Sequence, residues 1–142
     1  MKYLLLIYGE EKALNQTERE KCYIESTQLA HDLAANQQFL GANPLHPVAT
    51  ATSVRVRDGK RMVTDGPFAE TREQLGGYFL IDASNLDEAI AIAGRIPAAR
   101  WGTVEVRPVV EIPNLPVTGA SAEPARTVWP GTRRLDGVES HA

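Results

Sequence analysis

Two short segments of this chain are apolar at every position, and they constrain its fold more than any other feature. Leu4–Ile7 and Tyr78–Ile81 consist only of large hydrophobic or aromatic residues. Side chains of a β-strand alternate between two faces, so a strand of this composition has two apolar faces. Each segment is far shorter than the roughly 20 residues that span a bilayer. The segments therefore predict strands of a soluble protein's sheet that needs cover on both sides.

Charge and cysteine content limit the partners and the compartment. The formal net charge is −3 over 142 residues, which gives no overall attraction to nucleic acid. Neither a signal peptide nor a membrane-spanning segment is recognisable, so we expect a cytoplasmic protein without membrane contact. The single cysteine, Cys22, excludes an internal disulfide and a zinc site built from cysteines. It falls on the apolar side of a predicted helix, where a small buried hydrophobe is expected.

The first strand is predicted at Lys2–Tyr8, and a helix follows it. We expect this helix to begin at Thr17, because Glu20 stands three residues on in a capping-box spacing. Its apolar stripe, which Ser26 interrupts, is Cys22, Tyr23, Leu29, Ala30, Leu33 and Ala34. A loop is then predicted through Gly41, Asn43, Pro44 and Pro47.

A two-residue β-hairpin is predicted around Asp58-Gly59, since this dipeptide lies between alternating apolar residues. With that turn, Arg57 opposes Lys60, Val54 opposes Val63 and Thr52 opposes Asp65. Opposed residues share a face, so Asp65 projects from the face that also carries Val54, Val56 and Val63. The sequence thus predicts a carboxylate at the rim of an apolar surface.

The remaining elements complete an α+β fold. Gly77–Asp82 is a predicted strand, Ser84 or Asn85 caps a second helix that Pro97 ends, and Thr103–Ile112 is the last strand. The order strand, helix, hairpin, strand, helix, strand predicts a mainly antiparallel sheet with two helices on one face. Two helices leave the second apolar face uncovered, so we expect a homodimer that packs sheet against sheet.

The composition changes near Pro113. Residues 1–112 are expected to form the domain, whereas 113–142 are rich in Pro, Gly, Ser and Thr and are expected to be a flexible tail. The alternative is that Trp129 and its neighbours dock on the domain or on a partner subunit.

A signature follows the hairpin: Asp65-Gly66-Pro67-Phe68-Ala69-Glu70-Thr71, continued by Arg72-Glu73-Gln74-Leu75-Gly76-Gly77-Tyr78. This run resembles the DGPF proteins of the YCII-related family, and the resemblance extends over roughly residues 1 to 112. It implies a ferredoxin-like fold of the dimeric α+β barrel type, with a cleft near the signature in each subunit. YCII-like relatives carry a histidine–aspartate pair there, for which the matching residues in this chain are His46 and Asp65.

The residues themselves allow two roles for Asp65. A carboxylate at the edge of an apolar face can act as a general base or acid, and His46 can shuttle a proton beside it. Alternatively, an aspartate before Gly-Pro accepts backbone N–H groups of its own turn. Four further residues are candidates for lining a substrate cleft: Phe68, Glu70, Thr71 and Tyr78.

Three functions therefore remain open. The first is a cofactor-independent isomerase or lyase that binds a small organic molecule and transfers a proton. The second is an interaction module, since the family resemblance implies an association with sigma-factor systems. The third is that the signature only builds the fold and the dimer. No metal or cofactor site is expected, because three scattered histidines offer no ligand spacing. A basic cluster at the hairpin tip is expected to be a solvated surface rather than an anion contact: Arg55, Arg57, Lys60 and Arg61.

Overall fold

A computed structural model describes residues 1–116, in which Met1–Val110 form one compact unit and Glu111 begins a second. The predicted tail flexibility and the docking of Trp129 fall outside the described residues. Within the first unit the strands and helices are β1 (Lys2–Gly9), α1 (Gln16–Ala35), β2 (Phe39–Pro44), β3 (Thr52–Arg57), β4 (Lys60–Asp65), β5 (Gln74–Asp82), α2 (Leu86–Ala93) and β6 (Thr103–Pro108). Short 3-10 turns are η1 (Glu11–Ala13), η2 (Val48–Thr50) and η3 (Pro97–Arg100). Among residues 1–116, neither helix is long and apolar enough to cross a bilayer.

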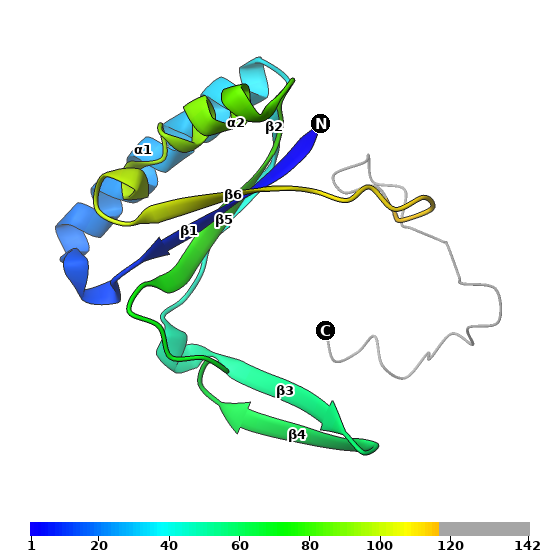
Figure 1. Ribbon diagram of the computed structural model, residues 1–142. Coiled ribbons are helices and arrows are strands. Elements are labelled where there is room, and N and C mark those ends of the chain that lie inside the picture. Colours follow the sequence, from blue (N-terminus) through cyan, green and yellow to red (C-terminus); the bar gives the residue numbers. More distant parts are fainter. Residues whose placement is uncertain (117–142) are drawn as a thin grey trace. The chain divides into compact units, whose positions relative to one another are not determined.

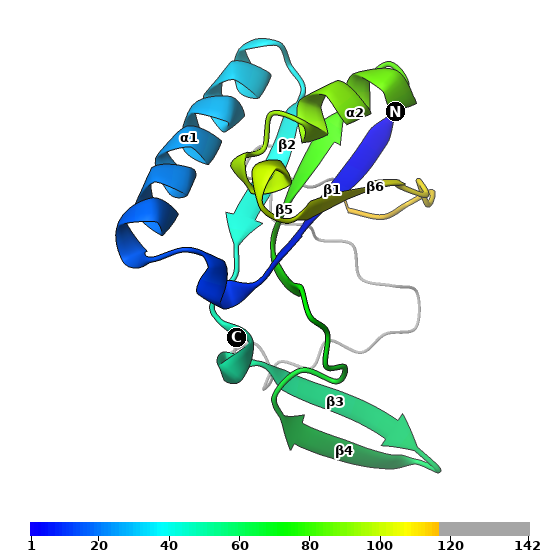
Figure 2. The ribbon, with the colours of Figure 1, turned by 60° about the vertical axis from the view of Figure 1, so that its left-hand side comes forward.

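The main sheet has the strand order β2-β5-β1-β6, with every neighbouring pair antiparallel. Without the inserted β3–β4 hairpin, the chain order is βαββαβ, the ferredoxin-like arrangement. Both helices lie on the same face of this sheet (Figure 2). The α+β class and the placement of the helices, expected from the sequence, are confirmed.

The two all-apolar segments are the two central strands. In the register of β1 and β5, Leu4 stands opposite Leu80 and Leu6 opposite Tyr78. The helices bury Leu5, Phe79 and Ile81, which explains the apolar residues on that face of the two strands. The four opposed side chains are half-buried and occupy the face that the helices do not cover.

Strand β2 was not expected, because the sequence predicted a loop across Gly41 to Pro47. Glycine, asparagine and proline are poor strand formers, but β2 is an edge strand, where they are tolerated. Gly77 of β5 makes the pairing possible. A Cβ at this residue would lie only 2.9 Å from the carbonyl oxygen of Asn43 and 3.2 Å from the Cα of Pro44.

The N-cap of helix α1 lies two residues before the expected one, Thr17. Asn15 is the N-cap: its Oδ1 accepts a hydrogen bond from the Glu18 N–H at 2.8 Å. The Glu18 carboxylate in turn accepts from the Asn15 N–H at 3.0 Å. The prediction of Thr17 with Glu20 was wrong, because Asn15 and Glu18 have the same capping-box spacing and asparagine is at least as good a cap as threonine.

Two later boundaries also differ from the prediction. Asn85 caps α2 through the Glu88 N–H at 2.9 Å, as one of the two expected residues. The helix then ends at Ala93, because Gly94 is its C-cap, and Pro97 instead begins η3. Strand β6 stops at Pro108 rather than at Ile112, since proline cannot donate to the ladder.

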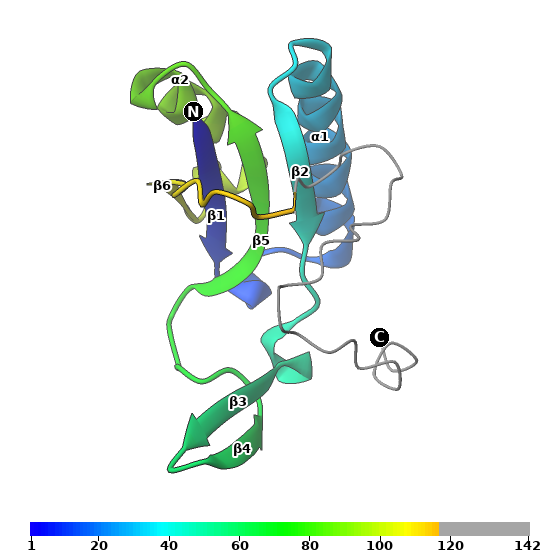
Figure 3. The same cartoon turned by 90° about the vertical axis from the view of Figure 1, so that its right-hand side faces the viewer.

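The core lies between the two helices and the covered face of the sheet (Figure 3). Its largest fully buried hydrophobic side chains are Leu5, Leu33, Ile81 and Ile96. Burying a side chain of this size stabilises a fold by about 1.5–3 kcal/mol.

The β3–β4 hairpin forms a two-stranded sheet of its own (Figure 1). Its turn is type I′, with φ of 51° at Asp58 and 74° at Gly59. The register predicted from the sequence is confirmed, including Val54 opposite Val63 and Thr52 opposite Asp65. No core covers this hairpin within the described residues, since both valines remain more than half exposed, at 59% and 56%.

Candidate functional site

A cavity of about 300 Å³ lies between α1 and the helix-covered face of the sheet. We call it the helix-side cavity. Its floor is formed by side chains of three adjacent strands, Ile7 on β1, Ala42 on β2 and Phe79 on β5. The rest of its lining comes from α1, η1, η3 and the residues after β2. Segments far apart in the sequence therefore build one hollow.

Most of this lining is apolar, and it includes aromatic side chains. Phe79 meets Phe39 edge to face, with ring centroids 6.4 Å apart and an interplanar angle of 81°. Trp101, which follows η3, lines the same cavity. Aromatic walls of this kind favour contact with a flat apolar group by edge-to-face or offset stacking.

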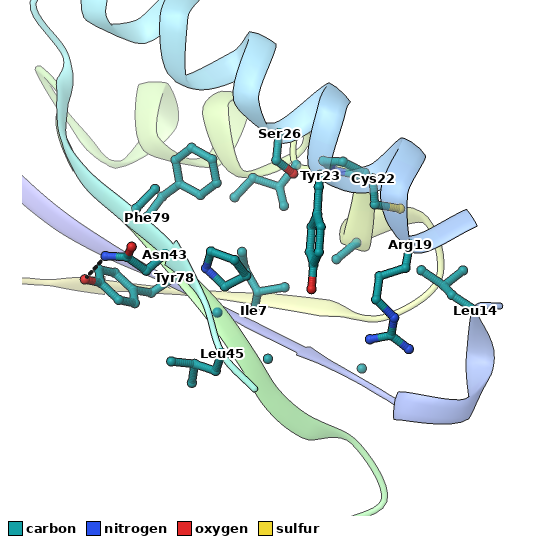
Figure 4. Close-up of a pocket in the computed structure, with 18 of the residues that line it drawn as sticks. Ile7, Leu14, Arg19, Cys22, Tyr23, Ser26, Asn43, Leu45, Tyr78 and Phe79 are labelled. Atoms are coloured by element: carbon teal, nitrogen blue, oxygen red, sulfur yellow. Dashed lines mark hydrogen bonds between the residues drawn. The ribbon is translucent and has the colours of Figure 1, made fainter. Parts of the chain in front are cut away.

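Polar side chains enter the cavity from α1. Arg19, Tyr23 and Ser26 are spaced by four and three residues, so they share the inner face of the helix. Figure 4 shows Arg19 and Tyr23 extending from the helix toward the sheet, with the guanidinium and the hydroxyl at their free ends. The Arg19 Nη2 donates to the carbonyl oxygen of Glu11 at 3.0 Å. Hydrogen-bond donors thus project over an apolar floor.

Two glutamates stand at the η1 end of the cavity. Glu11 accepts a hydrogen bond from the Val48 N–H at its Oε2, at 2.8 Å, which fixes the carboxylate and leaves Oε1 as an acceptor. Glu10 also lines the cavity, but the Arg72 Nε engages its carboxylate at 3.0 Å. Glu11 is therefore the cavity carboxylate that can take a proton from a bound molecule.

Of the predicted site residues, Tyr78 alone borders the helix-side cavity, and its side chain is directed to the opposite face of the sheet. Its hydroxyl accepts a hydrogen bond from the Asn43 Nδ2 at 2.9 Å. Figure 4 shows this pair to one side, away from Tyr23 and Arg19. The strand alternation explains the direction, because Tyr78 and Phe79 point to opposite faces of β5.

The other predicted residues lie outside the cavity lining and are exposed: Asp65, His46, Phe68, Glu70 and Thr71. His46 stands between two lining residues of the segment after β2, whereas Asp65 is the last residue of β4. No hydrogen bond or ion pair joins these two side chains within residues 1–116. The Thr71 hydroxyl is used locally and donates to the Glu73 carbonyl oxygen at 2.6 Å.

The signature turn is held by its glycine rather than by its aspartate. Gly66 has a φ of 96°, a conformation that favours glycine. Its N–H donates to the Ala51 carbonyl at 2.7 Å, and its own carbonyl accepts from the Ser53 hydroxyl at 2.8 Å. Asp65 makes no side-chain hydrogen bond to any described residue, so the expectation that its carboxylate binds the N–H groups of its turn was wrong.

The side chains that could bind a metal ion do not cluster in the part of the chain that the structure describes. Within residues 1–116, no three His, Cys, Asp or Glu side chains are grouped to hold an ion. Cys22 is half-buried and lines the helix-side cavity beside Tyr23.

Sequence reasoning missed the polar side chains of α1. The available signal was the break that Ser26 makes in an otherwise apolar stripe, together with Arg19, which stands seven residues before it on the same face. These polar residues interrupt the apolar stripe that a core-facing helix usually has.

Comparisons with known proteins extend over most of the chain. The family model described as YCII-related domain matches residues 1–113. An uncharacterised protein of Rhizobium meliloti (strain 1021) is 38% identical over 118 residues, which are 77% of this chain and 92% of that protein.

A solved structure has a similar fold. It is 5-chloro-2-hydroxyhydroquinone dehydrochlorinase from Burkholderia phenoliruptrix AC1100 in complex with 2,5-dihydroxybenzoquinone, with a TM-score of 0.50 and 13% identity. The match covers 78% of this chain and 94% of that one, and at this identity it describes the fold alone. The family match and the 38% identical relative together show that this chain belongs to the YCII-related domain family.

Proposed function

We propose that this protein binds a small organic molecule in the helix-side cavity and transfers a proton to or from it. The observation that carries the proposal is the convergence of Arg19, Tyr23 and Glu11 on one mostly apolar hollow. Ligand sites in proteins have this composition, with apolar walls and a few polar groups that fix the orientation of the ligand. A volume of about 300 Å³ matches a small ligand.

Glu11 is the proposed proton acceptor. Its Oε2 is held by the Val48 N–H, whereas no described donor binds its Oε1. Tyr23, with a hydroxyl that makes no hydrogen bond to other described residues, is the matching donor. One acceptor and one donor on opposite sides of a substrate suit an isomerase or lyase reaction.

The neighbour in fold supports a small-molecule role at a coarse level. That protein is named as a dehydrochlorinase and was solved with a dihydroxybenzoquinone, so a chain with this fold can hold a small ring compound. The fold serves unrelated activities in general, and the proposal for this chain therefore depends on its own cavity.

The protein is proposed to act as a cytoplasmic homodimer. Leu4, Leu6, Tyr78 and Leu80 form an apolar patch on the sheet face opposite the helices. Two copies of this patch would cover each other if the sheets packed face to face. The same arrangement leaves the helix-side cavity of each subunit on the far side of its sheet.

One observation favours a second function, that of an interaction module. The hairpin carries Val54, Val56 and Val63 on a single face, each more than half exposed. Exposed apolar residues in such a group are typical of a protein contact. A sigma factor is the partner proposed for it, and co-purification that is lost in a Val56→Asp variant would favour this function over the enzyme.

A small-molecule screen followed by protein NMR tests the leading proposal. We expect bound compounds to shift the resonances of Ile7 and Phe79, and Ala42→Phe, which fills the floor, to abolish these shifts. Ala69→Phe introduces the same side chain in the exposed signature loop and should leave them unchanged. The proposal is wrong if no compound binds, or if binding persists in Ala42→Phe.

A further inference from the structure

Arg19 is placed differently from the arginines that stabilise the surface. Arg72, Arg95 and Arg100 each meet a carboxylate at 3.0 Å or less. Arg19 is half-buried, yet its guanidinium donates to the backbone carbonyl of Glu11 rather than to a side chain. No carboxylate lies within ion-pair distance of its guanidinium among the described residues. A cavity cation with most of its five N–H donors unused is an anion receptor in chemical terms.

The neighbouring donors extend this receptor. Tyr23 stands one helical turn from Arg19, and Ser26 stands nearly another turn further along the same face. Neither hydroxyl donates to another described side chain or carbonyl. Figure 4 shows the phenol of Tyr23 and the guanidinium of Arg19 extending side by side from the helix. The side of the cavity formed by α1 therefore carries several hydrogen-bond donors, whereas a helix packed in a core carries apolar side chains at such positions.

The remaining walls define the body of the ligand. The floor consists of Ile7 and Phe79, and Trp101 lines the same space, so this part of the cavity accepts an apolar and preferably flat group. The volume of about 300 Å³ is at the lower end of the range for small-ligand sites. One ring with a short substituent fits this space.

We propose that the ligand is a monocyclic organic anion, with its carboxylate or phenolate oxygen bound by Arg19 and Tyr23 and its ring over the floor of Ile7 and Phe79. This inference rests on the proposed function and adds the chemical class of the ligand to it. Arg19 supplies charge-assisted hydrogen bonds, and the planar guanidinium matches a two-oxygen anion in geometry. Glu11, whose backbone carbonyl accepts from Arg19 at the η1 end, remains available as the proton acceptor.

Benzoate and benzamide are the matched probes, since they share a ring and a planar substituent but differ in charge. We expect benzoate to bind the full-length protein more tightly than benzamide in calorimetric or NMR titrations. Arg19→Gln should weaken benzoate roughly 10- to 100-fold and change benzamide less than about twofold, because it removes a charged hydrogen bond and keeps the stem. Arg19→Lys should restore part of the loss, and Arg107→Gln on the exposed edge of β6 is the control.

A second titration separates the two kinds of oxyanion. Binding of 4-nitrophenol can be followed by its visible colour, which reports the phenolate. If Arg19 binds phenolates, the bound compound should ionise at a lower pH than the free compound, and this shift should disappear in Arg19→Gln. A site for carboxylates alone would bind benzoate and leave the nitrophenol titration unchanged.

Each outcome separates this inference from the proposed function. Equal binding of benzoate and benzamide, lost in Ala42→Phe but unchanged in Arg19→Gln, would leave a cavity ligand in place and overturn its anionic character. Absence of binding by all three probes would overturn the inference, while other compounds from the screen could still occupy the cavity. Benzoate binding that survives Ala42→Phe would place the anion elsewhere and contradict the inference as well.

Discussion

The indole ring of Trp101 lies directly against the Cα of Gly9, with no room for a side chain between them. A Cβ built on Gly9 would overlap Cζ3 of the ring and lie 2.8 Å from Cη2. Gly9 is buried at the end of β1, and Trp101 follows η3, so this contact joins two segments that line the same cavity. The position of the ring, and with it one wall of the cavity, depends on a residue without a side chain.

Gly9→Ala should therefore destabilise the protein by about 1–3 kcal/mol, the usual cost of adding a methyl group to a packed site. Gly41→Ala is a matched control, because a Cβ there meets no atom within 4 Å. We expect the control to be neutral or slightly stabilising, since alanine restricts the unfolded chain. Urea unfolding measures both, and equal free energies of unfolding in the two variants would contradict the contact.

The cap of α1 offers a second stability test. Asn15→Ala removes the side chain that accepts the Glu18 N–H, and should cost about 1 kcal/mol. Thr17→Ala changes a residue inside the first turn and should cost much less, because alanine is the better helix former. Thermal unfolding of the two variants decides between the observed cap and the one expected from the sequence.

The ion pair between α1 and η3 predicts a dependence on pH. The hydrogen bond from Arg100 lowers the pKa of Glu25 from its ordinary value of 4.5, through two contacts of 2.8 and 2.9 Å. A carboxyl with a lowered pKa in the folded state stabilises the protein above its ordinary pKa, and this contribution is lost as the pH falls through the lowered value.

Glu25→Gln should accordingly be slightly less stable than the wild type at neutral pH, and the difference should disappear in acid. The effect is small because both side chains are largely exposed, and added salt should reduce it. Glu105→Gln on β6 provides the control. A stability difference that stayed constant from neutral pH into acid would show that the ion pair is not its cause.

The sheet face opposite the helices should control self-association. Leu80→Asp places a charge in the apolar patch that Leu4 and Leu6 share, so we expect a dimer of wild type to become monomeric in sedimentation or light scattering. Val56→Asp changes the exposed face of the hairpin and should leave the dimer intact. A monomeric wild type at micromolar concentration, or dissociation by the hairpin variant alone, would exclude the sheet-to-sheet dimer.

The two candidate proton acceptors can be compared in one assay. Once a ligand is identified, exchange of its acidic C–H proton in heavy water measures proton transfer. Glu11→Gln should slow the exchange by about 10²- to 10⁴-fold, the usual contribution of general acid–base catalysis. Asp65→Asn and His46→Gln should change it less than about twofold, since both side chains lie outside the cavity lining. If the Asp65 and His46 variants slowed the exchange and Glu11→Gln did not, the proton would be transferred at Asp65 and His46 instead of in the helix-side cavity.

The sequence was most informative where a local pattern determines the structure. The all-apolar runs identified the central strands, and Asp58-Gly59 determined the hairpin register through its turn type. Strand β2 was missed because its poor propensities are compensated by pairing with β5 at Gly77, a partner distant in sequence. Propensity describes a segment alone, whereas an edge strand depends on the neighbour it finds.

The candidate site was harder to predict for the same reason. The signature is conspicuous in the sequence, but its turn uses Gly66 and Ser53 to close the hairpin. The cavity instead combines an arginine from α1, a glutamate from η1 and a tryptophan after η3. No short motif contains these three residues, so only the packing of the helices on the sheet brings them together.

The place of the hairpin in the chain has a consequence for engineering. The hairpin leaves the main sheet after β2 and returns at β5, and these two strands are antiparallel neighbours. A short turn could therefore replace the entire excursion without changing the strand order of the sheet. The hairpin is in this sense a removable module. Exchanging the hairpins of two relatives, with the rest of each domain unchanged, would show which properties the hairpin confers.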